Sequence, residues 1–133
     1  MTHAKLEDLR ILSIDDDPFI LDVITTTLNH LGIARVETRT TAAAALDLIA
    51  RDGESIDVVL CDLHMPDMDG IEFMSELVAR EFNGCFAVVS GAGEVIVDMA
   101  KKLAGARGIR FLGSLQKPFR AKNLGDLLEK ALS

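Results

Sequence analysis

Five short apolar runs alternate with longer amphipathic segments along this chain, and this alternation constrains the fold more than any other feature. The runs have the length and aliphatic content of buried strands, and the segments between them repeat apolar residues at helical spacing. The runs are Leu9 to Ile14, Ile33 to Thr38, Ile56 to Cys61, Cys85 to Val89 and Ile109 to Leu115. A succession of βα units predicts an α/β fold, in which helices cover both faces of a parallel sheet.

Local signals mark the ends of the expected helices. Pro18 suits the first turn of a helix, Asp17 stands where a capping side chain is needed, and Gly32 is a natural stop. Asp52-Gly53 is expected to end an Ala-rich second helix, and Asn83-Gly84 to end the third. The later helices are expected over Thr41 to Arg51, Gly70 to Phe82, Glu94 to Ala104 and around Leu124 to Ala131.

Charge and composition exclude several classes of function. The formal net charge of −7 disfavours binding to nucleic acid or to an anionic membrane surface, because both are negatively charged. No run approaches the ~20 apolar residues of a membrane span, and the N-terminal residues lack the apolar stretch of a signal peptide. We therefore expect a cytoplasmic protein, in which Cys61 and Cys85 are reduced core thiols within apolar runs.

Four of the five expected strands end in polar residues that could form one site. These residues are Asp15, Asp16 and Asp17 after the first strand, Asp62 after the third, Ser90 at the fourth and Lys117 near the fifth. Ligands of open parallel sheets bind beyond the carboxyl ends of the strands, so these groups are expected at one edge. Crowded carboxylates call for a cation, and oxygen ligands in an open site suit Mg²⁺. An aspartate nucleophile beside a metal ion, a hydroxyl and a lysine fits phosphoryl transfer.

Each of these groups has a simpler interpretation when it is taken alone. Aspartates at strand ends often form caps or turns, and a Lys-Pro pair is usually an ordinary loop. The string from Ser90 to Gly93 lacks the third glycine of a dinucleotide fingerprint. The histidines at positions 3, 30 and 64 have no Cys or His partners at metal spacing, so we expect them on the surface or in turns. The joint occurrence at four strand ends favours a shared site.

Four strings of the sequence resemble the response-regulator receiver domains of two-component signalling. They are ILSIDDDP (Ile11 to Pro18), VVLCDLHMPDMDG (Val58 to Gly70), VVSGAG (Val88 to Gly93) and QKPF (Gln116 to Phe119), in the order of the family. The second string is the most specific, since Met-Pro and Asp-Gly follow a strand-closing aspartate at this spacing. The resemblance implies a flavodoxin-like (βα)5 doubly wound sheet with strand order 2-1-3-4-5. It also implies one receiver domain over residues 1–133, with no output domain.

The resemblance implies a role for each residue of the expected site. Asp62 would accept the phosphoryl group, and Asp15 and Asp16 would hold Mg²⁺ together with Asp62 and the backbone carbonyl of His64. Ser90 would be the switch hydroxyl, and Lys117 would be the family's lysine. Pro118 would follow a cis peptide bond. The phosphoryl donor would be a phosphohistidine on a sensor histidine kinase or a phosphotransfer protein. An output domain or partner protein would read the change of conformation. Such a domain catalyses only its own phosphorylation and dephosphorylation, so an enzyme with other substrates is not expected.

The sequence departs from the family's pattern in two places. The interval from Ser90 to Lys117 is several residues longer than usual, and Gly105 to Gly108 is expected to absorb the excess. The family's switch aromatic lies three residues before the lysine, where this chain has Ser114, and Phe111 is off register. A signal is therefore expected to leave the fourth-helix face differently. The string GIRFLGSLQKPF is similar to receivers fused to cyclic-di-GMP phosphodiesterase domains.

Two other functions stay open on the residues alone. A haloacid-dehalogenase-type phosphatase also uses an aspartate nucleophile, Ser or Thr, Lys and Mg²⁺, and Asp15 to Asp17 permit its opening Asp-x-Asp. After Lys117, however, only Asp126 and Glu129 remain as acidic residues, and no cap is expected to enclose a substrate. A pseudo-receiver that binds partners without phosphorylation is disfavoured, because the acidic set and the lysine are all present.

Overall fold

The computed structural model describes residues 5–91, 105 and 109–132, which contain a parallel five-stranded sheet. The strands are β1 (Arg10–Ile14), β2 (Arg35–Arg39), β3 (Val58–Cys61), β4 (Cys85–Ser90) and β5 (Arg110–Gln116). Their order is β2-β1-β3-β4-β5, and every neighbouring pair is parallel. The structure therefore confirms the predicted α/β class and the predicted strand order.

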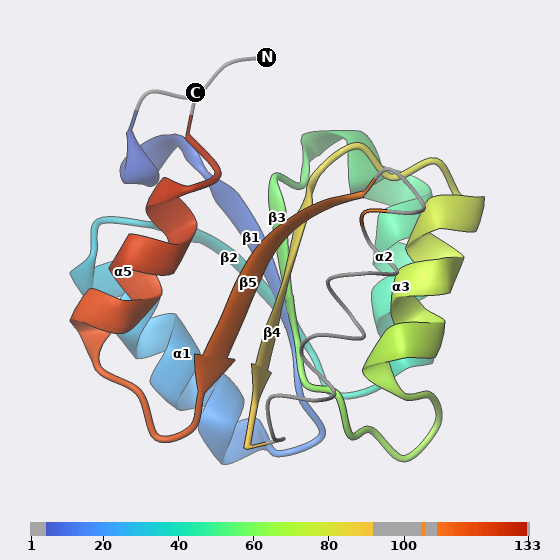
Figure 1. The fold of residues 1–133 in the computed structure, drawn as a ribbon, viewed down its shortest axis with the longest axis horizontal. Helices are drawn as coiled ribbons and strands as arrows, with labels where there is room; N and C mark the ends of the chain where they lie inside the picture. The colour runs from blue at the N-terminus through green and yellow to red at the C-terminus, as the bar shows by residue number, and fades with distance from the viewer. Residues whose placement is uncertain (1–4, 92–104, 106–108, 133) are drawn as a thin grey trace.

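Helices cover both faces of the sheet. The described helices are α1 (Pro18–His30), α2 (Ala42–Asp52), α3 (Gly70–Ala79) and α5 (Ala121–Glu129), with short 3-10 turns η1 (Leu6–Asp8) and η2 (Gly53–Ser55). Figure 1 shows α1 and α5 on one face and α2 and α3 on the other. The fourth helix predicted from the sequence, Glu94 to Ala104, lies outside the described residues, as do residues 106–108 of the expected glycine-containing connection.

The predicted start and stop of α1 are confirmed by its hydrogen bonds. The side chain of Asp17 accepts a hydrogen bond from the N–H of Phe19 at 2.9 Å, and Pro18 is the first helical residue. After the last turn, Gly32 has a φ of +91°, which glycine adopts without the steric cost that a side chain brings. The cap and the stop therefore fix the length of α1 from both ends.

α3 ends at Ala79 rather than at Phe82, so its predicted end was three residues too late. The N–H of Phe82 donates to the carbonyl of Leu77 at 3.0 Å, and the N–H of Glu81 donates to that of Val78 at 3.0 Å. This pair of bonds closes the helix in a Schellman motif, which needs a left-handed residue at Glu81, where φ is 58°. Glycine usually occupies that position, so the glutamate gave no indication in the sequence that the helix ends there.

The sheet separates two apolar cores. The core under α2 and α3 includes Leu12, Cys61 and Phe86, whereas the core under α1 and α5 includes Ile11, Leu60 and Cys85. This alternation follows the two-residue period of the strands. Both cysteines are buried and free, as predicted. Burial raises the pKa of the Cys61 thiol well above its ordinary value, which keeps this thiol protonated.

β5 contains one more residue than the strand beside it. Phe86 pairs with Phe111, but the next residue of β4, Ala87, pairs with Gly113, so Leu112 is inserted into the ladder. Gly113 has a φ of +130°, a conformation that side chains rarely adopt. The ring centroids of Phe86 and Phe111 lie 6.3 Å apart, and Phe111 packs against the core under α2 and α3.

Candidate functional site

Three aspartates gather at the carboxyl edge of the sheet. β1 and β3 are adjacent with Ile14 opposite Cys61, so the residues that follow them, Asp15 and Asp62, are neighbours. The carboxylate oxygens of Asp15, Asp16 and Asp62 lie within 4.8 Å of one another. Asp15 is 1% exposed and Asp62 is 8% exposed, whereas Asp16 is open to solvent. The strand ends thus bring together the acidic residues that the sequence singled out.

Lys117 contacts these carboxylates from the end of another strand, at the edge of the sheet. It follows β5, and its Nζ lies 2.6 Å from Oδ2 of Asp15 and 3.3 Å from Oδ2 of Asp62. Burial by itself would lower the pKa of Lys117, but the hydrogen bond to Asp15 and the charge of Asp62 outweigh it and raise the pKa above its ordinary value. Lys117 is therefore a fixed positive charge between the two buried carboxylates. The Lys117–Pro118 peptide bond is cis, as the resemblance implied.

Backbone amides orient the two buried carboxylates. Oδ1 of Asp62 accepts a hydrogen bond from the N–H of His64 at 3.0 Å, and Oδ1 of Asp15 accepts one from the N–H of Asp17 at 3.0 Å. The other oxygen of each carboxylate faces Lys117. The side chain of His64 is exposed, as expected for a histidine in a turn. Each carboxylate is thus held at one oxygen by its own loop and at the other by a shared cation.

Ser90 stands at the same edge of the sheet. It is the last residue of β4 and lies beside Gln116, which precedes Lys117. Gly91 follows it in the described chain, and the rest of the predicted Ser-Gly-Ala-Gly string lies outside the described residues. Four of the parallel strands therefore deliver their terminal residues to one region of the molecule, as the strand-end pattern predicted.

The donor set fits a hard divalent cation. Two of the three clustered carboxylates are buried, and one lysine does not balance the three negative charges. Oxygen ligands at an open edge match the preference of Mg²⁺, which keeps part of its water shell when it is bound. The site could therefore bring a metal ion, a carboxylate nucleophile and an ammonium group to the same phosphoryl group.

Asp67 is a polar residue near this edge that the sequence analysis did not single out. Its carboxylate accepts hydrogen bonds from the N–H groups of Ala42 and Ala43, which lie 25 and 24 residues earlier in the chain. The neighbouring Asp69 makes a local contact, since it caps α3 by accepting from the N–H of Glu72 at 2.8 Å. A contact between two distant loops leaves no comparable sequence signal.

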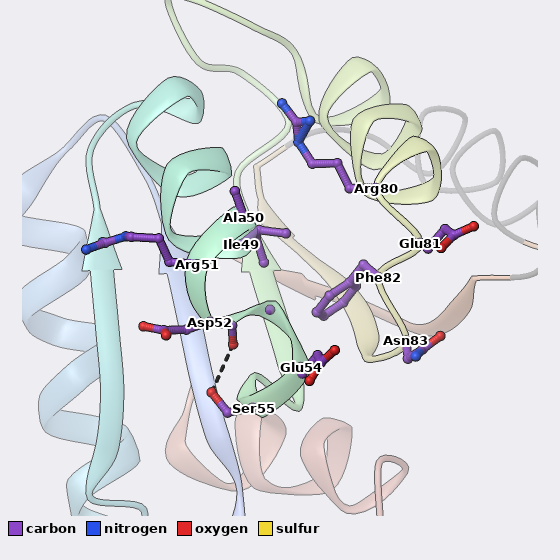
Figure 2. A pocket seen from close by; sticks show the side chains of 11 residues that line it. Ile49, Ala50, Arg51, Asp52, Glu54, Ser55, Arg80, Glu81, Phe82 and Asn83 are labelled. Carbon is purple, nitrogen blue, oxygen red and sulfur yellow. Dashed lines mark hydrogen bonds between the residues drawn. The ribbon is translucent and has the colours of Figure 1, made fainter.

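A hollow of the described structure lies away from the aspartate cluster. It has a volume of about 980 Å³ and lies between the C-terminal ends of α2 and α3. Figure 2 shows its labelled side chains, with Phe82 beside the end of α2 and a hydrogen bond from the hydroxyl of Ser55 to the carbonyl of Asp52. None of the aspartate cluster lines it. The chemistry of the residues, rather than the size of the hollow, identifies the candidate site.

No helix within the described part of the chain has both the length and the apolar character needed to cross a membrane.

Comparisons with known proteins point to one family. Residues 11–129 match the model of the response regulator receiver domain. The two-component response regulator ORR24 of Oryza sativa subsp. indica is 34% identical over 124 residues, which cover 93% of this chain and 19% of that protein. The cyclic di-GMP phosphodiesterase RocR of Pseudomonas aeruginosa is 25% identical over 125 residues, which cover 94% of this chain and 32% of that protein.

A solved structure agrees with this match. The response regulator receiver domain protein from Clostridium thermocellum has a TM-score of 0.80 and 27% sequence identity, over 92% of this chain and 93% of that one. The chain spans only 16% to 19% of the length of the rice response regulators that it matches. The similarity to those relatives therefore concerns one region of much longer proteins.

Proposed function

Since this chain belongs to the family of response regulator receiver domains, we propose that Asp62 accepts a phosphoryl group in a reaction that needs Mg²⁺. The proposal is supported above all by the position of Asp62 at the end of β3. There it shares Lys117 with Asp15 and lies in the three-aspartate cluster. Asp62 is also held by the N–H of His64, so that its carboxylate is oriented before any substrate arrives.

The reaction transfers a phosphoryl group to a carboxylate. An oxygen of Asp62 attacks the phosphorus of a phosphohistidine in line with the bond to nitrogen. The new oxygen–phosphorus bond forms as the nitrogen–phosphorus bond breaks, and the imidazole leaves with the electron pair and takes up a proton. The product is an acyl phosphate on Asp62.

Asp15, Asp16 and Asp62, with the backbone carbonyl of His64, would hold the metal ion. When bound, Mg²⁺ supplies positive charge that neutralises the oxygens of the phosphoryl group. Asp15 and Asp16 follow β1 and lie next to the proposed acceptor, so they can serve as ligands of the same ion. The exposure of Asp16 leaves this side of the cluster accessible from solvent.

Lys117 and Ser90 are proposed to bind the transferred group. In the unphosphorylated structure Lys117 contacts Asp62, and after transfer its ammonium group can contact a phosphoryl oxygen instead. Ser90 is proposed to donate its hydroxyl proton in a hydrogen bond to another phosphoryl oxygen. Both contacts exist only after transfer, so they favour one of two arrangements of the domain.

The domain is proposed to act as a signalling switch rather than as an enzyme with external substrates. It would catalyse only its own phosphorylation and dephosphorylation, in the cytoplasm, with a sensor histidine kinase or phosphotransfer protein as donor. We propose that residues 1–133 form one receiver domain, which controls an output domain or a separate partner protein. The likeness to RocR makes a cyclic di-GMP phosphodiesterase one candidate output.

Intact-mass spectrometry after incubation with acetyl phosphate tests the proposal. We expect the mass of one phosphoryl group to be gained with Mg²⁺ but not with EDTA, and to be lost on treatment with hydroxylamine, which cleaves acyl phosphates. Asp62→Asn should abolish the gain and leave the fold intact. Asp47→Asn is the matched control, because Asp47 is an exposed carboxylate on α2.

Each other result points to a different function. Equal labelling of Asp62→Asn and the wild type would show that the phosphoacceptor is another residue. A folded wild-type protein that takes no phosphoryl group would instead favour a pseudo-receiver. Rapid hydrolysis of added phosphate esters would favour a haloacid-dehalogenase-type phosphatase.

A further inference from the structure

Asp67 forms a cross-link between two loops beside the candidate site. It lies in the loop between β3 and α3, and its two carboxylate oxygens bind different backbone amides. Oδ1 accepts from the N–H of Ala42 at 3.2 Å, and Oδ2 accepts from the N–H of Ala43 at 3.1 Å. These amides open α2 and have no acceptor within the helix itself. The contact therefore ties the loop that carries Asp62 to the first turn of α2.

α2 has a cap of its own besides this cross-link. Thr41 precedes the helix, and its hydroxyl oxygen accepts a hydrogen bond from the N–H of Ala44 at 3.1 Å. Thr41 and Asp67 thus bind different amides of the same turn. Only Asp67 also connects that turn to another segment, so the two side chains differ in what they hold together.

The first turn of α2 packs in the same core as the loop that follows Asp62. Ala42 and Ala45 are fully buried and belong to the same core as Leu63 and Met65 of the loop. The chain just before α2 also binds the other half of the site, because the N–H of Asp15 donates to the carbonyl of Arg39 at 3.2 Å. The short segment from β2 into α2 therefore contacts both Asp15 and the loop that begins at Asp62.

The charge state of Asp67 suits this contact. The hydrogen bonds from the N–H groups of Ala43 and Ala42 lower the pKa of Asp67, although burial opposes them, so the carboxylate is ionised at neutral pH. An ionised carboxylate also complements the positive end of the α2 dipole. Both oxygens face α2, and the cluster of carboxylates within reach of one another consists of Asp15, Asp16 and Asp62.

We infer that Asp67 is a positioning residue for the loop between β3 and α3, which carries the proposed phosphoacceptor Asp62. Its contact with α2 fixes the chain after Asp62, including the backbone of His64, relative to Asp15. The inference rests on the proposed function, since this geometry affects activity only if Asp62 and the carbonyl of His64 serve metal binding and phosphoryl transfer. Loss of the contact would leave the acidic residues present but the loop free to adopt other arrangements.

Asp67→Ala and Thr41→Ala form a matched pair for the test. Each removes side-chain acceptors from the first turn of α2, but only Asp67→Ala releases the loop. The measurement is the Mg²⁺ concentration that gives half-maximal labelling by acetyl phosphate, determined by intact mass. We expect about a tenfold increase for Asp67→Ala, in the range found when a residue that orients a metal ligand is lost. Thr41→Ala should stay within about twofold of the wild type, because it weakens only the helix.

A conservative variant and an amide-exchange measurement complete the test. Asp67→Asn keeps one acceptor for an α2 amide and should fall between Asp67→Ala and the wild type. Amide hydrogen exchange in residues 63–69 should be faster in Asp67→Ala than in Thr41→Ala. If Asp67→Ala does not fold, the Mg²⁺ concentration for half-maximal labelling is compared between Asp67→Asn and Thr41→Ala instead.

The failures of the two proposals can be told apart. If the wild type is labelled and the Asp67 and Thr41 variants need the same Mg²⁺ concentration, the positioning role is wrong while the proposed function stands. If the folded wild type is not labelled at all, the proposed function is wrong, and the positioning role is overturned with it.

Discussion

Lys117 is the residue on which the charge balance of the site depends. It lies between Asp15 and Asp62, of which Asp15 is almost completely removed from solvent. A buried carboxylate without a partner is costly, because it loses its hydration without gaining a compensating contact. The lysine therefore has a structural role in the resting domain in addition to its proposed role toward the phosphoryl group.

Lys117→Met should expose this structural role. We expect the variant to lose about 2–4 kcal/mol of unfolding free energy in EDTA, because the buried Asp15 loses its cation. Saturating Mg²⁺ should restore part of the loss, since the ion supplies positive charge to the same carboxylates. Urea denaturation followed by far-ultraviolet circular dichroism measures both values. An equally large loss in EDTA and in Mg²⁺ would show that the ion does not bind beside Asp15.

The acidic residues of the site could be predicted because of where they stand in the sequence. Asp15 and Asp62 each follow an apolar run directly, and neighbouring parallel strands bring such residues to one edge. The pairing of Lys117 with Asp15 could not be predicted, since it depends on a side chain reaching across from β5. Asp67 escaped prediction for the same reason, because its partners belong to a different loop.

At the scale of elements, the start of α1 was more predictable than the end of α3 and the irregularity of β5. Asp17 and Pro18 predict the start of α1, because a capping side chain and a proline in the first turn act locally. The end of α3 depends on Glu81 accepting a left-handed conformation, which the packing around it must support. The extra residue in β5 depends on the register against β4, which no local pattern records.

Glu81→Gly should stabilise the end of α3. The glutamate has a φ of 58°, where its side chain costs about 1 kcal/mol relative to glycine. We expect a gain in unfolding free energy of about 0.5–1 kcal/mol, measured by urea denaturation. Arg80→Gly is the control, because Arg80 has an ordinary φ of −93° and glycine should destabilise the chain there. A loss of stability in Glu81→Gly would show that the glutamate side chain has contacts that outweigh the strain.

At the scale of the whole molecule, the sheet order determines where function resides. Periodicity predicted five parallel strands, but their order came from the resemblance to a family, because several right-handed arrangements share the same pattern. The observed order β2-β1-β3-β4-β5 puts β1 and β3 side by side at the centre of the sheet. The acidic cluster forms between these two strands, so it exists only when the sheet is assembled.

The acidic cluster should therefore couple metal binding to global stability. Mg²⁺ that binds only the folded sheet stabilises it by about 2.7 kcal/mol when its concentration is one hundred times the dissociation constant. Asp16→Asn should remove most of this increment, since it deletes an exposed carboxylate that is proposed to be a ligand. It should leave the stability in EDTA equal or slightly higher, because one negative charge beside Asp15 and Asp62 is gone. Urea denaturation of both proteins with Mg²⁺ and with EDTA tests this. An undiminished Mg²⁺ effect in Asp16→Asn would mean that Asp16 is not a ligand, and a loss of stability in EDTA would mean that its carboxylate supports the fold itself.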